Sequence, residues 1–418
     1  MEDEAEKLMI DALSKNFINH ESYPITTDIQ NRCVNMIARL FNAPTQGGSG
    51  NVIGTSTAGS SEAILLATLA MKKRWANRQK AAGKDSNMPN LIMSSAVHVC
   101  WKKAALYFDV EERYVYCTNE RYTIDPYEAV DLVDENTIGI CSIMGTTYTG
   151  EYEDTKAIND LLVERDLDVP IHVDAASGGF VAPFLNPNLI WDFRLEKVAS
   201  INVSGHKYGL VYAGIGWVIW RDKEYLPKGE LGILNVASVS HTSNMSLPEL
   251  IFNLNYLGTE QASFTLNFSR GASHIISQYY KLIRLGKKGY RRVMLDLICK
   301  AEYLALNLEK MGCFILISKK HGQGLPLVAF RLDPVKGYTF DEFAIADELR
   351  EQGGWVVPAY TMAPRSEELK ILRVVVREDF SHAHSDALIA DVHKVLCRLR
   401  MTDACTPSTE NGSLATSN

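Results

Sequence analysis

The sequence contains no long apolar segment. No run of about 18 apolar residues, the length that a membrane-spanning helix needs, occurs in its 418 residues. The opening stretch MEDEAEK is acidic and lacks the basic start and apolar core of a secretory signal. We therefore expect a protein of the cytoplasm that has no membrane partner.

An excess of basic residues is also missing. The chain has 43 Lys and Arg against 50 Asp and Glu, which gives a net charge of -7 and a pI near 5.9. Domains that bind nucleic acids usually carry a basic surface. We therefore expect no nucleic-acid partner.

Closely spaced cysteine pairs, which zinc and redox sites typically show, do not occur. The eight cysteines stand singly, at positions 33, 100, 117, 141, 299, 313, 397 and 405. We interpret them as reduced thiols of a cytosolic protein, and we predict no metal site. A dinucleotide-binding oxidoreductase is disfavoured as well, because no G-x-G-x-x-G follows an early strand.

The length exceeds the roughly 250–300 residues at which one hydrophobic core stops growing, so we expect a large and a small domain. The hydrophobic content of 46% and the charged content of 22% are those of a globular protein. The closing stretch TDACTPSTENGSLATSN is polar, which predicts a disordered tail. It lacks a basic amphipathic helix, so we expect no calmodulin binding.

Strand and helix patterns alternate from about residue 50 to 220. Short runs rich in Val and Ile, bounded by Gly, Pro or Asn, predict strands at 90–95, 113–117, 137–145, 170–175, 198–205 and 214–220. Helical spacing lies between them, at 60–79, 101–108, 125–133 and 154–166. This order predicts an α/β fold with a mainly parallel sheet covered on both faces, and ligands bind at the carboxyl ends of such strands.

The second half of the chain predicts a smaller α+β unit. Two long helical stretches occupy about 268–311. Strand patterns then follow at 313–318, 325–332 and 369–376, and helical patterns at 341–352 and 384–400. We place the domain boundary near 270–290.

The stretch STAGSSEAILL, residues 56–66, indicates an anion site. Gly59, Ser60 and Ser61 precede a helix, so backbone N–H groups, two hydroxyls and the positive helix end meet where a phosphate could bind. The alternative is that Ser60 only caps the helix, with Glu62 in its first turn.

Two further strand ends carry reactive side chains. Asp174 follows the strand in PIHVDAASGG, and Lys207 follows the strand in VASINVSGHKYG. Asp174 alone could be a turn or cap residue. A buried lysine, however, favours Schiff-base chemistry, and pyridoxal phosphate needs an amine, a partner for its pyridine nitrogen and a phosphate cradle.

These motifs carry a family resemblance. HVDAASGG, the Lys of SGHKYG 33 residues after the Asp, and TAGSSEA resemble the pyridoxal-phosphate-dependent group II amino acid decarboxylases. Longer stretches, including RCVNMIARLFNAP, NYLGTEQASFTLNFSR and QYYKLIRLGKKGY, resemble the glutamate decarboxylases of bacterial, plant and fungal type. The resemblance covers roughly residues 5–400.

The resemblance implies the fold type I of pyridoxal-phosphate-dependent transferases, with a seven-stranded, mainly parallel sheet and a small C-terminal α+β domain. It divides the chain into an N-terminal helical segment (1–45), a cofactor-binding domain (46–280), a small domain (281–400) and a tail (401–418). Only 20 residues precede ESYP. We therefore expect the N-terminal segment, which in the family helps to dimerise the protein and to bind the distal carboxylate, to be shorter than usual.

The resemblance also implies a set of cofactor-binding residues. Lys207 would form the Schiff base and Asp174 would pair with the pyridine nitrogen. His98 would stack on the ring, where bacterial enzymes carry Gln, and could transfer protons. The remaining contacts would come from Ser60, Ser61 and His206 at the phosphate, Ala176 beneath the ring, Thr147 beside the ring, and Ser269, which the family supplies from the neighbouring subunit.

Two further residues would bind substrate. Arg373 falls on the family's arginine for the α-carboxylate, although an arginine in a strand could also be a solvated edge residue. Asn19 stands where bacterial enzymes have an Asp near the distal carboxylate.

The resemblance thus implies decarboxylation of L-glutamate to 4-aminobutyrate by a homodimer or higher homo-oligomer. Two alternatives remain: a related decarboxylase acting on another amino acid, and a truncated cofactor-binding product without activity.

Overall fold

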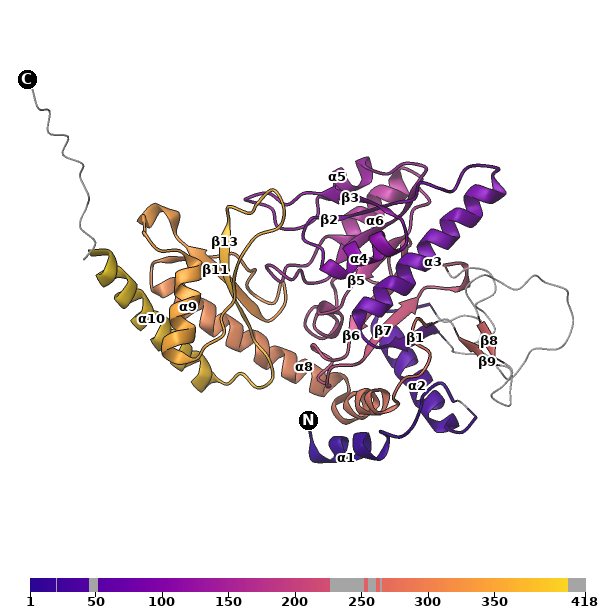
Figure 1. Cartoon of the computed structure of the whole chain (residues 1–418), viewed down its shortest axis with the longest axis horizontal. Coiled ribbons are helices and arrows are strands. Elements are labelled where there is room, and N and C mark those ends of the chain that lie inside the picture. Colours follow the sequence, from indigo (N-terminus) through magenta and orange to yellow (C-terminus); the bar gives the residue numbers. More distant parts are fainter. Residues whose placement is uncertain (20, 45–51, 226–251, 255–260, 264, 405–418) are drawn as a thin grey trace, which may run out of the picture.

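The computed structural model describes residues 1–19, 21–44, 52–225, 252–254, 261–263 and 265–404. Two β-sheets organise this part of the chain, and a long helix, α8, runs from one to the other (Figure 1). Helix α8 packs against α1, α2 and α7 at the large sheet, and against β10, β11 and α10 at the small sheet.

The large sheet has seven strands in the order β1-β7-β6-β5-β4-β2-β3. They are β1 (Ile53–Thr57), β2 (Asn90–Ser94), β3 (Glu111–Val115), β4 (Thr137–Ile143), β5 (Ile171–Asp174), β6 (Val198–Ser204) and β7 (Gly216–Trp220). Strand β7 is antiparallel to both of its neighbours, and all other pairs are parallel. The predicted mainly parallel seven-stranded sheet is confirmed.

Six of these strands match predicted ones, and β1 is the strand that the pattern did not indicate. Its sequence, IGTST, is polar, yet every residue of it is buried. A Cβ added at Gly54 would lie 2.8 Å from the carbonyl oxygen of Val218 on β7. A larger side chain would therefore separate the two strands.

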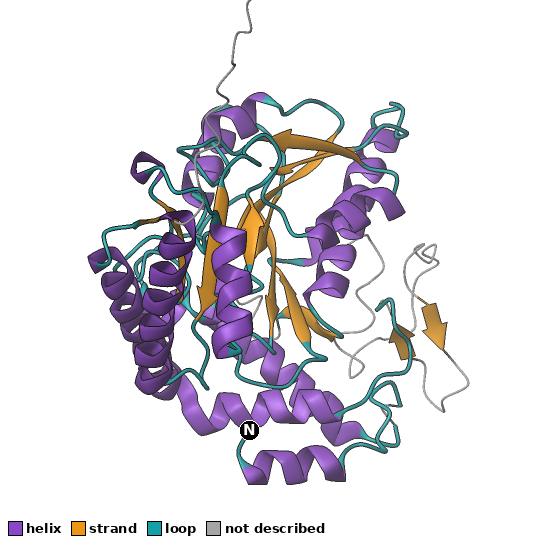
Figure 2. Cartoon of the chain, turned by 60° about the vertical axis from the view of Figure 1, so that its left-hand side comes forward, coloured by secondary structure: helices purple, strands orange, loops and turns teal. Residues whose placement is uncertain are grey.

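Helices cover both faces of the large sheet (Figure 2). Val218 packs with Ala63 of α3 (Ser60–Ala81), whereas its neighbours Trp217 and Ile219 share a cluster with Ile37 of α2 (Pro24–Leu40). Because successive strand residues point to opposite faces, α2 and α3 lie on opposite sides of the sheet. The other helices here are α1 (Asp3–Asp11), α4 (Val99–Tyr107), α5 (Pro126–Asp131), α6 (Thr155–Glu164) and α7 (Ala182–Leu185).

Helix α8 (Ser273–Lys310) is interrupted once. Gly286 has φ 56° and ψ -171°, which is not helical, so the chain forms two helical stretches as predicted. This interruption falls within the predicted boundary range of 270–290. The domain limits themselves stay a prediction.

The small sheet is antiparallel throughout, in the order β10-β11-β13-β12. Its strands are β10 (Phe314–Leu316), β11 (Leu327–Leu332), β12 (Ala359–Thr361) and β13 (Lys370–Val375), and its helices are α9 (Glu342–Gly353) and α10 (His382–Ala404). Strand β12 was not predicted, because three residues are too short for a periodic pattern. A separate two-stranded sheet pairs β8 (Phe252–Leu254) with β9 (Gln261–Ser263).

The structure describes only the first four residues of the predicted tail. Helix α10 continues to Ala404, so residues 401–404 are helical, and residues 405–418 lie outside the described part. Within the described ranges, no helix combines the length and the apolar character needed to cross a membrane.

Candidate active site

Two adjoining cavities lie at the carboxyl ends of the large sheet's strands. One measures about 650 Å³ and the other about 920 Å³. Five residues line both: His98, Thr147, Ser177, His206 and Lys207. They follow β2, β4, β5 and β6, so the expected edge of the sheet carries the site.

The smaller cavity begins at the N-terminus of α3. Gly59 is the N-cap residue, with no side-chain cap, and Ser60 is the first helical residue. The Ser60 hydroxyl lies 2.6 Å from the hydroxyl of Ser204 at the end of β6. The alternative that Ser60 caps the helix is therefore wrong. The Ser60 and Ser61 side chains instead line the cavity, with the free N–H groups of the helix start beside them.

Close backbone packing shapes this end of the cavity. A Cβ on Gly216 would lie 2.5 Å from the carbonyl carbon of Gly59, so only glycine permits β7 to pass there. Glu62 also fixes the backbone before α3. Its carboxylate accepts a 2.7 Å hydrogen bond from the Ala58 N–H and a 3.1 Å bond from the Leu266 N–H.

The carboxylate of Asp174 is held by three donors. Its Oδ2 accepts from Trp101 Nε1 at 2.9 Å, and its Oδ1 accepts from Asn202 Nδ2 and from the Ala176 N–H, each at 3.1 Å. The bond from Ala176 is the turn contact that the alternative reading anticipated. A turn residue does not need the two side-chain donors. They fix both oxygens of the Asp174 carboxylate at the wall of the cavity, which indicates a role beyond the turn.

A buried histidine, His172, contacts both side chains that hold Asp174. His172 Nε2 lies 2.8 Å from Asn202 Oδ1, its Nδ1 lies 2.7 Å from Ser200 Oγ, and Trp101 packs edge-on against its ring. Burial lowers the pKa of His172 to about 4, so the ring is neutral near pH 7. The sequence analysis missed Trp101, Asn202 and His172. One sequence signal could have indicated His172 and Asn202. Polar residues at 172 and 174 of β5 and at 200 and 202 of β6 alternate along their strands, so they lie on one face of the sheet.

His98 is both a helix cap and a cavity residue. Its Nδ1 accepts from the Cys100 N–H at 3.3 Å, so the neutral ring carries its proton on Nε2. Burial and the positive charge of Lys207 lower the pKa of His98. The pKa of His206 is lowered by the same two causes. Both rings are therefore neutral near pH 7.

Arg373 enters the larger cavity from the small sheet. Strand β13 lies between β11 and β12, so the alternative of a solvated edge arginine is wrong. The guanidinium Nη1 donates to the Thr147 carbonyl oxygen of the large-sheet region. Lys207 and Arg373 thus line one cavity, although they are 166 positions apart in the chain.

Ser269 and Asn19 lie outside both of these cavities. Ser269 lines a separate cavity of about 270 Å³, and its hydroxyl accepts from Asn16 Nδ2 at 3.2 Å. The Asn19 side chain accepts from the Ser22 N–H at 3.3 Å. The two segments are neighbours, since the Phe17 N–H donates to the Arg270 carbonyl oxygen at 2.7 Å. Within one chain, neither residue lines a described cavity together with Lys207.

The seven cysteines of the described ranges are free thiols. Across the same ranges, no group of three His, Cys, Asp or Glu side chains is arranged to hold a metal ion.

The family model of the pyridoxal-dependent decarboxylase conserved domain matches residues 5–333. The chain belongs to the pyridoxal-dependent decarboxylases. Its cofactor is therefore pyridoxal phosphate, as predicted, and the recognised family is confirmed. The four-stranded small sheet completes the decarboxylase fold.

Relatives of this decarboxylase cover nearly all of the chain. It is 52% identical to the glutamate decarboxylase of Petunia hybrida over 96% of this chain and 75% of the relative. It is 44% identical to glutamate decarboxylase beta of Listeria monocytogenes over 94% and 80%. The solved structure of Lactobacillus brevis glutamate decarboxylase superposes with a TM-score of 0.85 at 42% identity, over 96% of this chain and 86% of that one.

The residues of this decarboxylase fit pyridoxal phosphate. The smaller cavity is lined by the helix start with Ser60 and Ser61, by Asp174 with both carboxylate oxygens hydrogen-bonded, and by Lys207. These are the three groups that the cofactor needs, and the close approach at Gly216 shapes the phosphate end.

Proposed function

We propose that this decarboxylase releases the α-carboxyl group of L-glutamate as CO2 and yields 4-aminobutyrate. The observation that carries the proposal is the single cavity lined by Lys207, His98 and Arg373, which offers an amine, a proton carrier and a carboxylate partner. The choice of glutamate rests on the relatives, which are named glutamate decarboxylases.

The positions of the cavity residues support the proposed cofactor-binding roles. Ser60 and Ser61 would hold the phosphate at the start of α3, with His206 nearby. Ala176 would leave room beneath the ring, and Thr147 would lie beside it. When bound, pyridoxal phosphate supplies a sink for the electron pair left at Cα when a bond there breaks. Asp174 would hold the ring nitrogen, and Lys207 is the amine that would attach the cofactor.

His98 is placed to deliver a proton to Cα after CO2 leaves, once its ring has taken up a second proton from solvent, because a neutral imidazole is too weak an acid to give up its own. The ring is neutral and carries its proton on Nε2, because Nδ1 is committed to the Cys100 N–H. A neutral imidazole can also stack on a protonated pyridine ring without bringing two positive charges together. We propose both roles for His98, stacking and proton transfer.

Arg373 would select the bond that breaks. A guanidinium binds a carboxylate with two parallel hydrogen bonds, which fixes orientation as well as position. Held in this way, the α-carboxylate keeps one direction relative to the cofactor ring. Asn19 would contact the distal carboxylate.

A substrate panel tests the proposal. We expect CO2 release from L-glutamate to exceed that from aromatic amino acids, aspartate and cysteine sulfinate by at least about a hundredfold in kcat/KM, because the aromatic acids lack the distal carboxylate and the other two place their distal acid group one carbon closer to Cα. Faster release from another amino acid would favour a related decarboxylase. Tight cofactor binding without release from any of them would favour the inactive product.

We also propose a homodimer with shared active sites. Ser269 and Asn19 lie on neighbouring segments outside the cavities of their own chain, and the apolar side chains of Leu266 and Phe268 are exposed beside Ser269. A second copy packed here would bury these side chains and bring Ser269 to the phosphate of the other chain. A cytoplasmic location is proposed too, supported by the free thiols.

Hybrid dimers test this arrangement. Ser269→Asp should repel the phosphate and inactivate the decarboxylase, as should Lys207→Ala. Each hybrid then has one site with both defects and one intact site, so a random mixture should regain about a quarter of the wild-type activity. Activity that stays at the level of the separate variants after subunit exchange would contradict shared sites.

A further inference from the structure

The guanidinium of Arg373 is held from two sides. Its Nη1 donates to the carbonyl oxygen of Thr147, and its Cζ lies 5.3 Å from the centre of the Tyr360 ring. The Tyr360 hydroxyl donates to the next carbonyl oxygen, that of Tyr148, at 2.7 Å. Two consecutive carbonyl oxygens of the large-sheet region therefore accept hydrogen bonds from this pair, one from Arg373 and one from Tyr360.

Tyr360 is itself fixed. It lies on β12, where it pairs with Ile371 of β13, and its ring packs edge-on against the Tyr148 ring at 5.8 Å. Burial raises the pKa of Tyr360, so the phenol keeps its proton and remains a donor.

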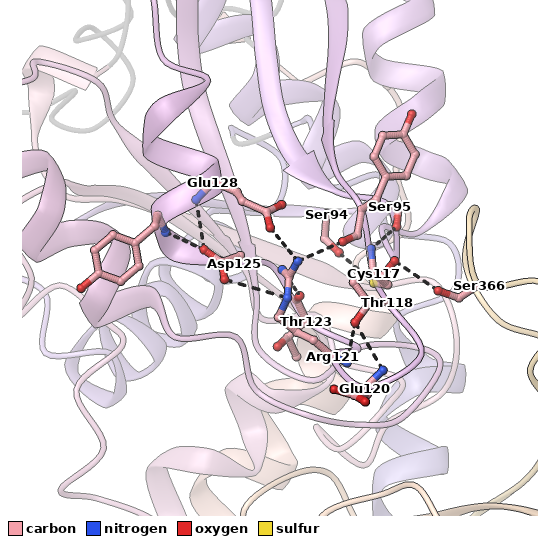
Figure 3. A network of polar contacts seen from close by, with 12 residues as sticks. Ser94, Ser95, Cys117, Thr118, Glu120, Arg121, Thr123, Asp125, Glu128 and Ser366 are labelled. Carbon is pink, nitrogen blue, oxygen red and sulfur yellow. Dashed lines mark hydrogen bonds and ion pairs between the residues drawn. The ribbon is translucent and has the colours of Figure 1, made fainter.

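The loop between β12 and β13 is anchored as well. The Ser366 side chain is fully buried, and its hydroxyl donates to the Cys117 carbonyl oxygen at 3.1 Å (Figure 3). The Cys117 N–H in turn donates to Ser95 Oγ at 3.0 Å. Arg365 places its guanidinium 3.5 Å from the centre of the Tyr116 ring. Both strands of the hairpin that carries Arg373, and the loop between them, therefore contact the large-sheet region.

We propose that Tyr360 is a positioning residue that directs the guanidinium of Arg373 at the substrate's α-carboxylate. This inference rests on the proposed function of Arg373. Nη1 has one of its two hydrogens committed to Thr147, and Nε is buried without a partner. The free hydrogens of Nη1 and Nη2 remain at the tip of the side chain. Arg373 thus binds a carboxylate end-on, and only while the tip points into the cavity.

The tyrosine ring is what limits this direction. An arginine side chain has several rotatable bonds, and one hydrogen bond to Thr147 leaves the guanidinium plane free to turn about it. The Tyr360 ring, whose centre lies 5.3 Å from the guanidinium carbon, limits this turning by occupying the space beside the guanidinium, and the bond to Tyr148 keeps the ring in place. Loss of the ring should weaken the binding of ligands that carry an α-carboxylate and should not affect the binding of ligands that lack one.

The experiment compares L-glutamate with 4-aminobutyrate, which keeps the amine and the distal carboxylate but lacks the α-carboxylate. The cofactor-loaded variants Tyr360→Leu and Tyr360→Phe are measured for the KM of glutamate and for the Ki of 4-aminobutyrate. Tyr152→Phe is the matched control, because the Tyr152 hydroxyl donates to the Gly324 carbonyl oxygen at 3.1 Å in another contact between the two sheets' regions. Thermal melting checks that each variant is folded.

We expect Tyr360→Leu to raise the KM of glutamate about tenfold, with the Ki of 4-aminobutyrate unchanged within about twofold. Tyr360→Phe should raise KM less, since the ring remains, and Tyr152→Phe should change neither constant. Equal changes in KM and Ki for Tyr360→Leu would overturn the proposal, as would no change in either.

A failure of the substrate assignment is recognised separately. It would be seen in the wild type, as decarboxylation of another amino acid. The amino acid that is decarboxylated and the amine that it yields then replace L-glutamate and 4-aminobutyrate in the same comparison, so the role of Tyr360 is still tested.

Discussion

Replacing Lys207 by alanine is expected to lower CO2 release from L-glutamate by at least about a thousandfold, a loss typical of removing a covalent catalytic group. Lys207 is the amine that lines both the cofactor cavity and the larger cavity beside it. Alanine cannot attach the cofactor or release the product from it. Steady-state CO2 release by cofactor-loaded protein, with thermal melting as a check of the fold, measures this effect.

Lys207→Arg is the matched control for charge. Arginine keeps a cation in the cavity, but it stays protonated and does not act as a nucleophilic amine. We expect this variant to be as inactive as Lys207→Ala. Activity within about tenfold of wild type in Lys207→Arg would show that only the charge matters, and would contradict covalent attachment.

The second large effect is expected at Asp174. Asp174→Asn keeps the size of the side chain but removes its charge, and each pKa unit lost at the ring nitrogen is worth about 1.4 kcal/mol, or roughly tenfold. The new amide also places an N–H₂ group opposite Trp101 Nε1 or Asn202 Nδ2, both of which are donors. We expect kcat to fall by at least about a hundredfold while the protein still binds its cofactor.

A second buried aspartate provides the control for Asp174. Asp192 is 1% exposed, lies outside the cavities, and accepts from Asn42 Nδ2 at 2.8 Å and from Arg194 Nε at 2.8 Å. Asp192→Asn should lower thermal stability but leave kcat within about threefold of wild type in the folded fraction. Equal losses of kcat in the two variants would mean that Asp174 acts through stability alone.

The positions of the reactive residues were largely predictable from strand ends. Asp174 and Lys207 follow β5 and β6 directly, so a parallel sheet brings them to one edge whatever the details of packing. Arg373 was accessible only through family resemblance. Its approach to Thr147 depends on how the small sheet packs on the large one, and no local pattern encodes that packing.

Other features have no sequence signal of their own. Trp101 looks like an ordinary core residue of α4, and only its 2.9 Å bond to Asp174 shows its second role. Strand β1 escaped prediction because the close approach at Gly54 requires small residues, which resemble a loop. The contact between Tyr360 and Arg373 joins a three-residue strand to its neighbour, and such short strands show no periodicity.

The most direct test of glutamate decarboxylation uses substrate labelled in one carboxyl carbon at a time. The purified protein with pyridoxal phosphate is given L-glutamate labelled at C1 or at C5, and both labelled CO2 and 4-aminobutyrate are measured. We predict labelled CO2 from the C1 substrate only, in equal moles with 4-aminobutyrate. Cofactor-loaded protein that releases no label from either position would contradict the account.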